Sequence, residues 1–404
     1  MQMNAVGIDV SKGKSTVAVL RPLGEIVAKP FDVCHTKSGI RNLVNYLNSL
    51  DGECRIVLEH TGRYYELMAR WLSDAGLFVS AVNPKLIKDF DNNSLRRVKT
   101  DKADSKKIAR YTLDKWDNLR QYTAMDTTRT KLKVMNRQMS FFQKQQTAYK
   151  NNLIALLDET YPGVNKFFSS PTRPDGSEKW VDFAEKFWHV DRVANISLTS
   201  FTKKYEIWCK KHGYLFQPNK PKEIRDISLN LIPILPNDDI TKTLIQQAIS
   251  QLNAISKAVE ELRQQMNDLA SQLPEYPVVM SMYGVGTTLG PQLIAEIGDI
   301  SKFSKRSQLT AFAGVDPGVN SSGDYFQKSV RTSKHGSPYL RKTLFLIMDV
   351  LIQNHPENNP VYKFMAKKRD EGKPYYVYTT AGANKFLRIY FGKVKEYLNN
   401  LPPG

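Results

Sequence analysis

The sequence predicts an α/β domain at the N-terminus, two long α-helical arms, and a mostly α-helical C-terminal domain. Three observations favour this division. Segments with strand and helix periodicity alternate near the N-terminus, apolar residues then recur at heptad spacing in two stretches, and helical spacing resumes near the C-terminus. The 404 residues are enough for several separate cores. We expect an α/β domain, a first coiled-coil arm, an insert, a second arm and a C-terminal domain at residues 1–125, 126–160, 161–242, 243–275 and 276–404.

The N-terminal domain opens with three strand-like segments that are close enough in sequence to form hairpins. Residues 5–10 alternate large apolar residues with small or polar ones, which is typical of a strand. Strands are expected at 5–10, 15–20, 24–33, 55–59 and 77–82, and helices at 36–50, 64–75, 84–89 and from Thr100 onward. A ribonuclease-H-like domain has this order of elements, in which hairpin strands come first and are followed by strands that alternate with helices.

Four carboxylates in this domain are candidate metal ligands. Asp9 interrupts a strand, where a charge is costly unless it is paired or bound to a metal ion. Glu59 ends an otherwise apolar strand, and the active residues of α/β sheets gather at strand ends. Asp101 and Asp104 are three residues apart, so a helix capped by Thr100 carries both on one face. Such acids suit Mg²⁺, which prefers carboxylate oxygens, although solvated acids at a helix start also fit the pattern.

The composition indicates a protein that binds a polyanion. The chain has 58 Lys and Arg against 40 Asp and Glu, a formal charge of +18. Residues 301–404 hold 17 of the basic and 7 of the acidic residues, so more than half of the excess lies there. The three cysteines form no Cys-x-x-Cys pair, which argues against a disulfide framework and a thiolate zinc site. Without a signal peptide or an apolar run of membrane-spanning length, the sequence predicts a cytoplasmic protein that does not enter membranes.

Apolar residues recur every three or four positions in both predicted arms, as in a coiled-coil seam. The first seam comprises Leu132, Met135, Met139, Phe142, Gln146, Tyr149, Leu153 and Leu156. The second comprises Ile245, Ala248, Leu252, Ile255, Val259, Leu262, Met266, Leu269 and Leu273, before Pro274 stops the helix. The arms either pair within one chain, join two chains, or form core helices of a bundle, and the polar Gln146 is suited to setting the register. The insert is apolar enough to fold, but its function is not readable.

A second candidate site lies in the C-terminal domain. Residues 318–323 are rich in glycine, serine and asparagine and predict a loop in which Ser322 precedes Gly323. Basic residues follow, which we expect to bind nucleic acid: Lys328, Arg331, Lys334, Arg341 and Lys342. Serine before glycine is usual in turns, whereas a serine beside phosphate-binding groups can be a nucleophile. The local sequence leaves both roles open, and it does not separate Ser322 from the adjacent Ser321.

Short motifs at both ends of the chain together resemble one known family. They are Gly7-Ile-Asp-Val10, Glu59-His-Thr-Gly62, Lys99-Thr-Asp-Lys-Ala-Asp104, Gly284-Val-Gly286, Ala311-Phe-Ala-Gly-Val-Asp-Pro317, Ser322-Gly323 and Ser333-Lys-His-Gly336. In this order they resemble the DEDD insertion-sequence recombinases, the Piv/MooV-like transposases guided by a bridge RNA. The resemblance implies a RuvC-like domain whose four catalytic acids match Asp9, Glu59, Asp101 and Asp104. It also implies a transposase domain whose nucleophilic serine matches Ser322, because the family motif is Ser-Gly.

The same resemblance implies RNA-guided DNA recombination. Strands are cut and exchanged through a covalent phosphoserine, and the acids hold Mg²⁺ that assists the chemistry. The implied partners are a guide RNA, donor and target DNA, and further copies of the chain. In the implied dimer or tetramer the site is composite, since the serine domain of one copy meets the acids of another. The insert at 161–242 departs from compact members of the family.

Two other functions fit the sequence. The protein is alternatively a RuvC-like, metal-dependent, structure-selective nuclease, in which water attacks DNA and Ser322 is a turn residue. A non-catalytic nucleic-acid-binding scaffold with relic acids is the second alternative. Metal-dependent DNA cleavage separates the scaffold from the enzymes, and a covalent protein–DNA adduct separates serine attack from hydrolysis.

Overall fold

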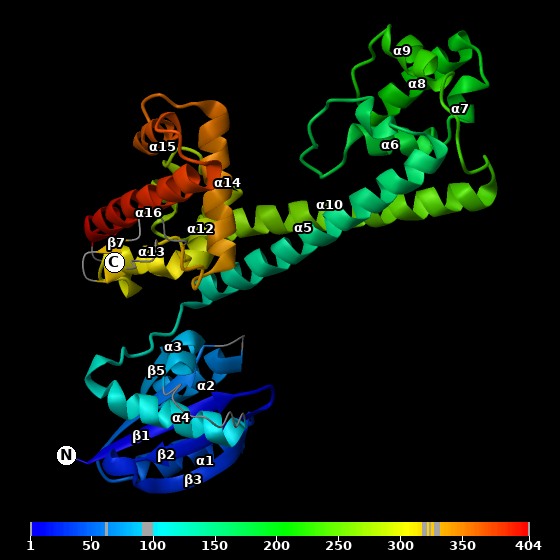
Figure 1. Cartoon of the computed structure of the whole chain (residues 1–404). Helices are drawn as coiled ribbons and strands as arrows, with labels where there is room; N and C mark the ends of the chain where they lie inside the picture. Colours follow the sequence, from blue (N-terminus) through cyan, green and yellow to red (C-terminus); the bar gives the residue numbers. More distant parts are fainter. Residues whose placement is uncertain are drawn as a thin grey trace. The chain divides into compact units, whose positions relative to one another are not determined.

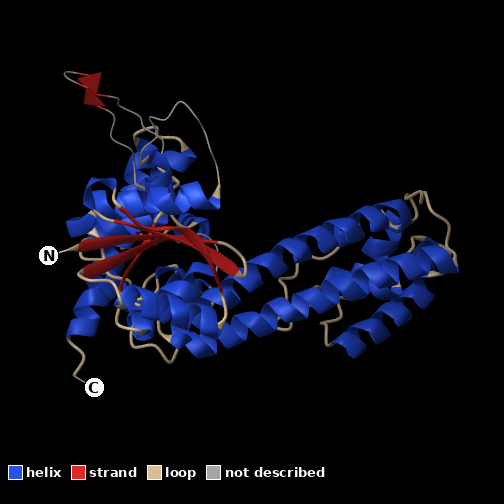
Figure 2. Ribbon diagram, turned by 90° about the horizontal axis from the view of Figure 1, so that it is seen from below, coloured by secondary structure: helices blue, strands red, loops and turns tan. Residues whose placement is uncertain are grey.

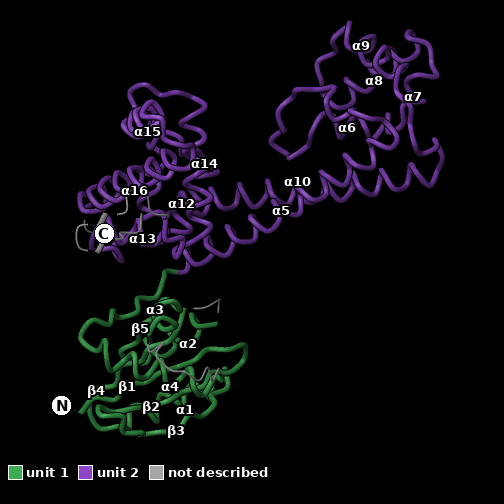
Figure 3. The backbone as a smooth tube through the Cα atoms, viewed as in Figure 1, with its two compact units in different colours: residues 1–126 green, residues 127–404 purple. Residues whose placement is uncertain are grey.

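The computed structural model describes residues 2–60, 64–90, 100–316, 321–322, 325–326 and 332–402. The chain forms two compact units, residues 1–126 and 127–404 (Figure 3). Figure 2 distinguishes the strands, most of which belong to the sheet of the first unit, from the helices that dominate the second. Among the described residues, no helix combines the length and the apolar character needed to cross a membrane.

The first unit is a mixed α/β structure. Its strands are β1 (Met3–Val10), β2 (Lys14–Leu20), β3 (Ile26–Cys34), β4 (Glu53–Glu59) and β5 (Phe78–Val82). Its helices are α1 (Lys37–Asn48), α2 (Tyr64–Asp74), α3 (Pro84–Asp89) and α4 (Asp101–Asp114). The expected elements are confirmed, with bounds that differ by no more than two residues. The Thr100 side chain caps α4 as predicted, accepting a hydrogen bond of 3.2 Å from the backbone N–H of Ala103.

The sheet has the strand order β3-β2-β1-β4-β5, with β1 antiparallel to β2 and parallel to β4. Side chains such as Val6 and Ile8 pack with those of α1 and α2 on one face. Val57 packs with Ile108 of α4 on the other face. This alternation follows from the two-residue period of a strand, and it makes α4 the cover of the second face (Figure 1).

Gly7 in β1 sets how closely α4 approaches the sheet. A Cβ atom at this position would clash with the carbonyl oxygen of Ser105 and with the backbone nitrogen of Ala109. Only glycine lets the helix backbone rest directly on the strand. The first turn of α4 is therefore held close to the end of β1, where Asp9 lies.

The second unit is almost entirely helical. Two long helices, α5 (Thr127–Thr160) and α10 (Asp239–Ala270), enclose the insert in sequence. The insert contains α6 (Lys179–Lys186), α7 (Asp191–Ala194), α8 (Leu198–His212) and α9 (Lys220–Ser228). The C-terminal part contains α11 (Tyr276–Met280), α12 (Leu289–Ile297), α13 (Arg306–Ala313), β6 (Ser321–Ser322), β7 (Tyr325–Phe326), α14 (Pro338–Asn354), α15 (Pro360–Asp370) and α16 (Tyr375–Asn399).

The two long helices pair with each other inside the chain (Figure 1). Leu132, Met139 and Val259 are buried toward one end of the pair, together with the C-terminal helices. At the other end the seam is buried with the aromatic core of the insert. Gln146 donates a hydrogen bond of 2.9 Å to Ser256 across the pair, as suits a polar residue that sets the register. Of the arrangements that the heptads allowed, the structure has pairing within one chain.

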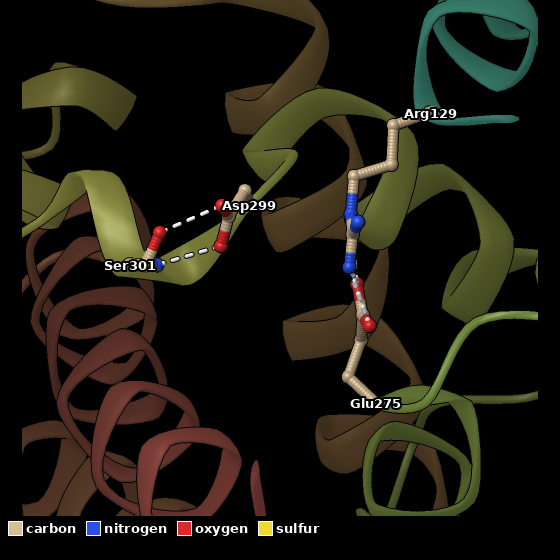
Figure 4. Close-up of polar contacts among 4 residues, drawn as sticks. All are labelled: Arg129, Glu275, Asp299 and Ser301. Atoms are coloured by element: carbon tan, nitrogen blue, oxygen red, sulfur yellow. Dashed lines mark hydrogen bonds and ion pairs between the residues drawn. The ribbon is translucent and has the colours of Figure 1, made fainter. Parts of the chain in front are cut away.

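A buried ion pair fixes the start of α5 to the C-terminal helices. The Arg129 guanidinium donates from Nη2 to both carboxylate oxygens of Glu275, at 2.5 and 2.6 Å, with only 3 % of the Glu275 side chain exposed (Figure 4). Nearby, Asp299 accepts hydrogen bonds from the N–H and hydroxyl of Ser301 (Figure 4). The Arg129–Glu275 ion pair links the end of the helical pair to the C-terminal helices.

Candidate active site

Polar side chains form a row across the carboxyl end of β1. Asp9 pairs with Thr16 on β2, and Thr16 pairs with Asp32 on β3. On the other side, Ile8 pairs with Leu58 on β4, so Asp9 and Glu59 are the next residues of two adjacent parallel strands. The row therefore brings three carboxylates from three strands to one edge of the sheet.

The row lies on the face that α4 covers. Asp9 shares the face of Gly7, which contacts α4, because the two residues are separated by one strand period. Glu59 shares the face of Val57, which packs with Ile108 of α4. Asp9 and Glu59 are both half-buried there.

Two of the other candidate acids act electrostatically on Glu59. Burial raises the pKa of the Glu59 carboxyl to about 7, and repulsion by Asp9 and then by Asp104 contributes to the rise. The Lys107 ammonium partly offsets this increase in pKa. Like charges that act on one another in this way are costly without a compensating cation.

Asp101 occupies the first turn of α4 and is exposed. It acts on the Lys14 ammonium, whose pKa is raised mainly by its hydrogen bond to Asp32 and to a smaller extent by Asp101. Lys14 and Asp32 form an ion pair of 2.7 Å at the surface. Asp104 therefore acts on Glu59, whereas Asp101 acts on Lys14, which pairs with Asp32 where β2 and β3 meet.

The acids suit a hard divalent cation by their chemistry, because carboxylate oxygens are the ligands that Mg²⁺ prefers. The raised pKa of Glu59 marks a place where positive charge is favourable. Among the described side chains, however, no three possible ligands are close enough together to hold a metal ion. The carboxylates have to draw closer before they share one cation.

The sequence did not single out Lys14, Thr16 and Asp32 as part of this edge. Asp32 accepts hydrogen bonds from Lys14 at 2.7 Å and from Thr16 at 2.8 Å, and the hydrogen bond from Lys14 is the main reason that its pKa is lowered. The signal was present, since Thr16 and Asp32 lie within predicted strands. Finding it required the pairing register of three strands.

Ser322 lies in a short hairpin rather than in the irregular loop that the sequence predicted. Ser321 pairs with Phe326, and Ser322 pairs with Tyr325, so the two residues between them are Gly323 and Asp324. The structure describes the backbone of Ser322 and of its strand partner.

The segments on both sides of this hairpin are held together at its base. The backbone N–H of Lys334 donates to the carbonyl of Gly314 at 3.2 Å, and the Ser333 hydroxyl donates to the Asp316 carboxylate at 2.7 Å. Nη1 of Arg341 donates to the carbonyl oxygens of Ala313 and Gly336, at 3.0 and 3.1 Å. The described segments that precede and follow the residues around Ser322, 313–316 and 333–336, are therefore held against each other.

The predicted nucleic-acid-binding residues are in different situations. Lys328 and Arg331 lie outside the described residues. Lys334 is exposed beside the hairpin base, and Lys342 is exposed and donates to Gln143 at 3.1 Å. Arg341 supports the hairpin base, a structural role that the sequence did not predict.

Comparisons with known proteins agree with the motifs in both units. A DEDD-type transposase model of IS110 elements matches residues 6–162, which include all four acids. A model described as a transposase of the IS116/IS110/IS902 family matches residues 276–363, which include Ser322. The chain belongs to the IS110-type transposase family. It is therefore an enzyme of DNA recombination.

Relatives of this transposase family match along most of the chain. An uncharacterized 43.6 kDa protein of insertion element IS110 from Streptomyces coelicolor is 20% identical, over 99% of this chain and 96% of the relative. A putative transposase for IS117 from the same organism is 22% identical, over 94% and 91%. The pilin gene-inverting protein of Moraxella bovis is 22% identical, over 84% and 80%. The two family models leave residues 163–275 unmatched, so neither describes the insert.

Proposed function

We propose that this insertion-sequence transposase is an RNA-guided recombinase that cuts and exchanges DNA strands through a covalent phosphoserine at Ser322. In this proposal the first unit is a RuvC-like domain, and Asp9, Glu59, Asp101 and Asp104 are its catalytic acids. The strand order supports the RuvC-like assignment, because hairpin strands precede strands that alternate with helices.

One observation carries the proposal for the acids. The pKa of Glu59 is raised by burial and by two further carboxylates, Asp9 and Asp104, on the face that α4 covers. An ordinary sheet edge does not collect charges of one sign at a half-buried position. Nucleic-acid-cutting sites do so, because the carboxylates are ligands.

In the proposed site the four acids hold Mg²⁺. Bound there, Mg²⁺ supplies positive charge that stabilises the phosphate and the leaving oxygen during strand cleavage. Glu59 gives up its proton when it becomes a ligand, and α4 orients Asp101 and Asp104 from one helix turn. The Lys14–Asp32 ion pair flanks the acids and orients Thr16 next to Asp9.

The serine step requires no external energy source. The Ser322 hydroxyl loses its proton as its oxygen bonds to phosphorus, and a deoxyribose oxygen leaves and takes up a proton. The phosphodiester energy is kept in the phosphoserine, so a second strand can be joined by reversal of the step. A hairpin whose base is fixed by Ser333 and Arg341 is a suitable carrier for such a nucleophile.

The proposed partners are a guide RNA, donor and target DNA, and further copies of the chain. The formal charge of +18 supports binding of long polyanions, and base pairing by the guide would then choose the DNA sites. We propose a dimer or tetramer in which the serine of one copy works with the acids of another.

The test of the metal site is strand cleavage by the purified protein with guide RNA, element-end DNA and Mg²⁺. Asp9→Asn removes a ligand charge with little change in volume, so we expect cleavage to fall by at least about a hundredfold while the fold is kept. The matched control is Asp74→Asn, an exposed carboxylate on α2 paired only loosely with Arg70, and it should cleave at the normal rate. Normal recombination by Asp9→Asn would count against the metal site.

The same assay separates the alternatives. Cleavage that needs a divalent metal but leaves no protein on the DNA supports the nuclease with a water nucleophile. Tight binding of RNA and DNA without any cleavage supports the scaffold. A guide RNA encoded beside the gene, with loops that match the element ends, supports RNA guidance.

A further inference from the structure

Three cationic side chains of the insert converge on two aromatic rings. The Arg173 guanidinium lies over the Tyr214 ring, 4.0 Å from its centroid. The Lys179 ammonium lies 4.9 Å from the centroid of Tyr214 and 5.0 Å from that of Phe168. The Lys220 ammonium also lies over the Phe168 ring, 5.9 Å from its centroid. We call these five residues the cation–aromatic cluster.

The rings of this cluster are fixed from beneath. Tyr214 packs against Trp208 at 5.1 Å between ring centroids, and its hydroxyl donates a 2.6 Å hydrogen bond to Asp182. Phe168 packs against Phe183 at 5.4 Å. Trp208 and Phe183 are buried in the core of the insert, so the Tyr214 and Phe168 rings that pack on them are held in place.

Two of the three cations of the cluster, Arg173 and Lys179, have no ion-pair partner among the described side chains, whereas Glu223 offsets the charge of Lys220. In the part of the chain that the structure describes, Lys179 has no ion pair, and burial together with Lys220 and Arg173 lowers its pKa. Arg173 donates to the carbonyl oxygen of His212 at 2.7 Å, a neutral partner. Lys220 pairs with Glu223, which is largely exposed. An aromatic face attracts a cation without cancelling its charge, so the cluster keeps like charges together for an external anion.

We propose that the cation–aromatic cluster binds the phosphodiester backbone of a nucleic-acid strand. A guanidinium stacked on a ring keeps its N–H donors in one plane for phosphate oxygens, and two ammonium groups beside it extend the site along a strand. The cluster lies between the regions matched by the two family models, in the insert whose function the sequence did not reveal. This site is independent of the serine and of the metal-binding acids.

The test measures binding of the full chain to short fluorescein-labelled oligouridine and oligothymidine strands of equal length, without divalent metal. Arg173→Gln together with Lys179→Gln removes two charges from the cluster. The matched control, Lys203→Gln together with Lys210→Gln, removes two charges from exposed positions on α8. Thermal unfolding checks that each protein folds, and Lys179→Gln alone replaces the double variant if that one does not.

We expect the cluster variant to bind the strands several-fold more weakly than the control variant does. The slope of log affinity against log salt concentration should become less steep by about 0.7 for each lost phosphate contact. If the cluster variant binds only oligouridine more weakly, the site binds RNA, and if it binds only oligothymidine more weakly, the site binds DNA. Weaker binding of both strands indicates a contact with the backbone that RNA and DNA share. Equal affinities and equal salt slopes of the two double variants would overturn the proposal. Because the assay contains no metal and involves no cleavage, its result is separate from that of the recombination assay.

Discussion

Glu59 is half-buried between other carboxylates, and its raised pKa has consequences for stability. The pKa is about 7 in the folded protein, above the ordinary value of 4.5, because of burial and then of Asp9 and Asp104. A group whose pKa is raised by folding stabilises the fold fully below its unfolded pKa. That contribution is lost as the pH rises through the folded value. Without metal, the protein should therefore lose stability between about pH 4.5 and pH 7 through this group.

A bound divalent cation reverses this trend, because it needs the ionised form of Glu59. We expect Mg²⁺ to raise the melting temperature more at one pH unit above the Glu59 pKa than at one unit below it. Thermal unfolding with and without Mg²⁺ at both pH values measures the difference. In Glu59→Gln the pH dependence of the Mg²⁺ effect should disappear, and Glu66→Gln on α2 is the control. An Mg²⁺ effect in the wild-type protein that is equal at both pH values would contradict the site.

At the residue scale, the sequence singled out the acids as candidate site residues but not their neighbours. Asp9 and Glu59 were found because a charge in or at the end of an apolar strand is unusual by itself. Asp32 was not singled out, because its importance comes from Thr16 and Lys14, which belong to another strand. Contacts across strands depend on register, which a single sequence does not specify.

At the element scale, Gly7 is the position on which the site geometry depends most. In Gly7→Ala the new methyl group meets Ser105 and Ala109, so α4 has to move away from β1. We expect the free energy of unfolding to fall by about 1–3 kcal/mol, the usual cost of overpacking, and cleavage to fall with it because Asp104 moves from Glu59. Denaturant unfolding and the cleavage assay measure the two effects.

Gly392→Ala on α16 is the matched control for this change. Nothing lies within 4 Å of a Cβ atom there, and alanine favours a helix over glycine, so stability should stay equal or rise. If Gly7→Ala is as stable and as active as the wild-type protein, α4 is not held against β1 in the way the structure describes.

The elements themselves were largely predictable, but their partners were not. Strand alternation and helix spacing predicted α1 to α4, including the Thr100 cap, and heptads predicted α5 and α10. The heptad spacing of apolar residues does not specify which helix a seam packs against. In the structure, α5 packs against α10 of the same chain. The sequence predicts a loop at Ser322 where the structure has a pair of short strands, because two-residue strands carry too little pattern to detect.

At the scale of the whole molecule, pairing within the chain affects how copies can assemble. The buried parts of both seams already have partners within the chain, so an oligomer joined through the arms has to use their other faces, where Val134 and Phe141 are exposed. We predict a dimer or tetramer through the arms, because large exposed apolar side chains on a long helix favour association. Light scattering with and without RNA measures the mass, and Phe141→Ser should weaken assembly. A monomer under both conditions would contradict the prediction.

The central claim is that the Ser322 oxygen attacks DNA, and a denaturing gel of protein, guide RNA and labelled DNA with Mg²⁺ tests it most directly. The account predicts a DNA band that is retarded by covalently attached protein. In Ser322→Ala, both this band and the cleaved DNA should be absent. Ser322→Ala removes one oxygen atom, so folding and RNA binding should be kept, and Ser321→Ala should retain the adduct. Cleavage at the wild-type rate by Ser322→Ala would show that water is the nucleophile and would contradict the account.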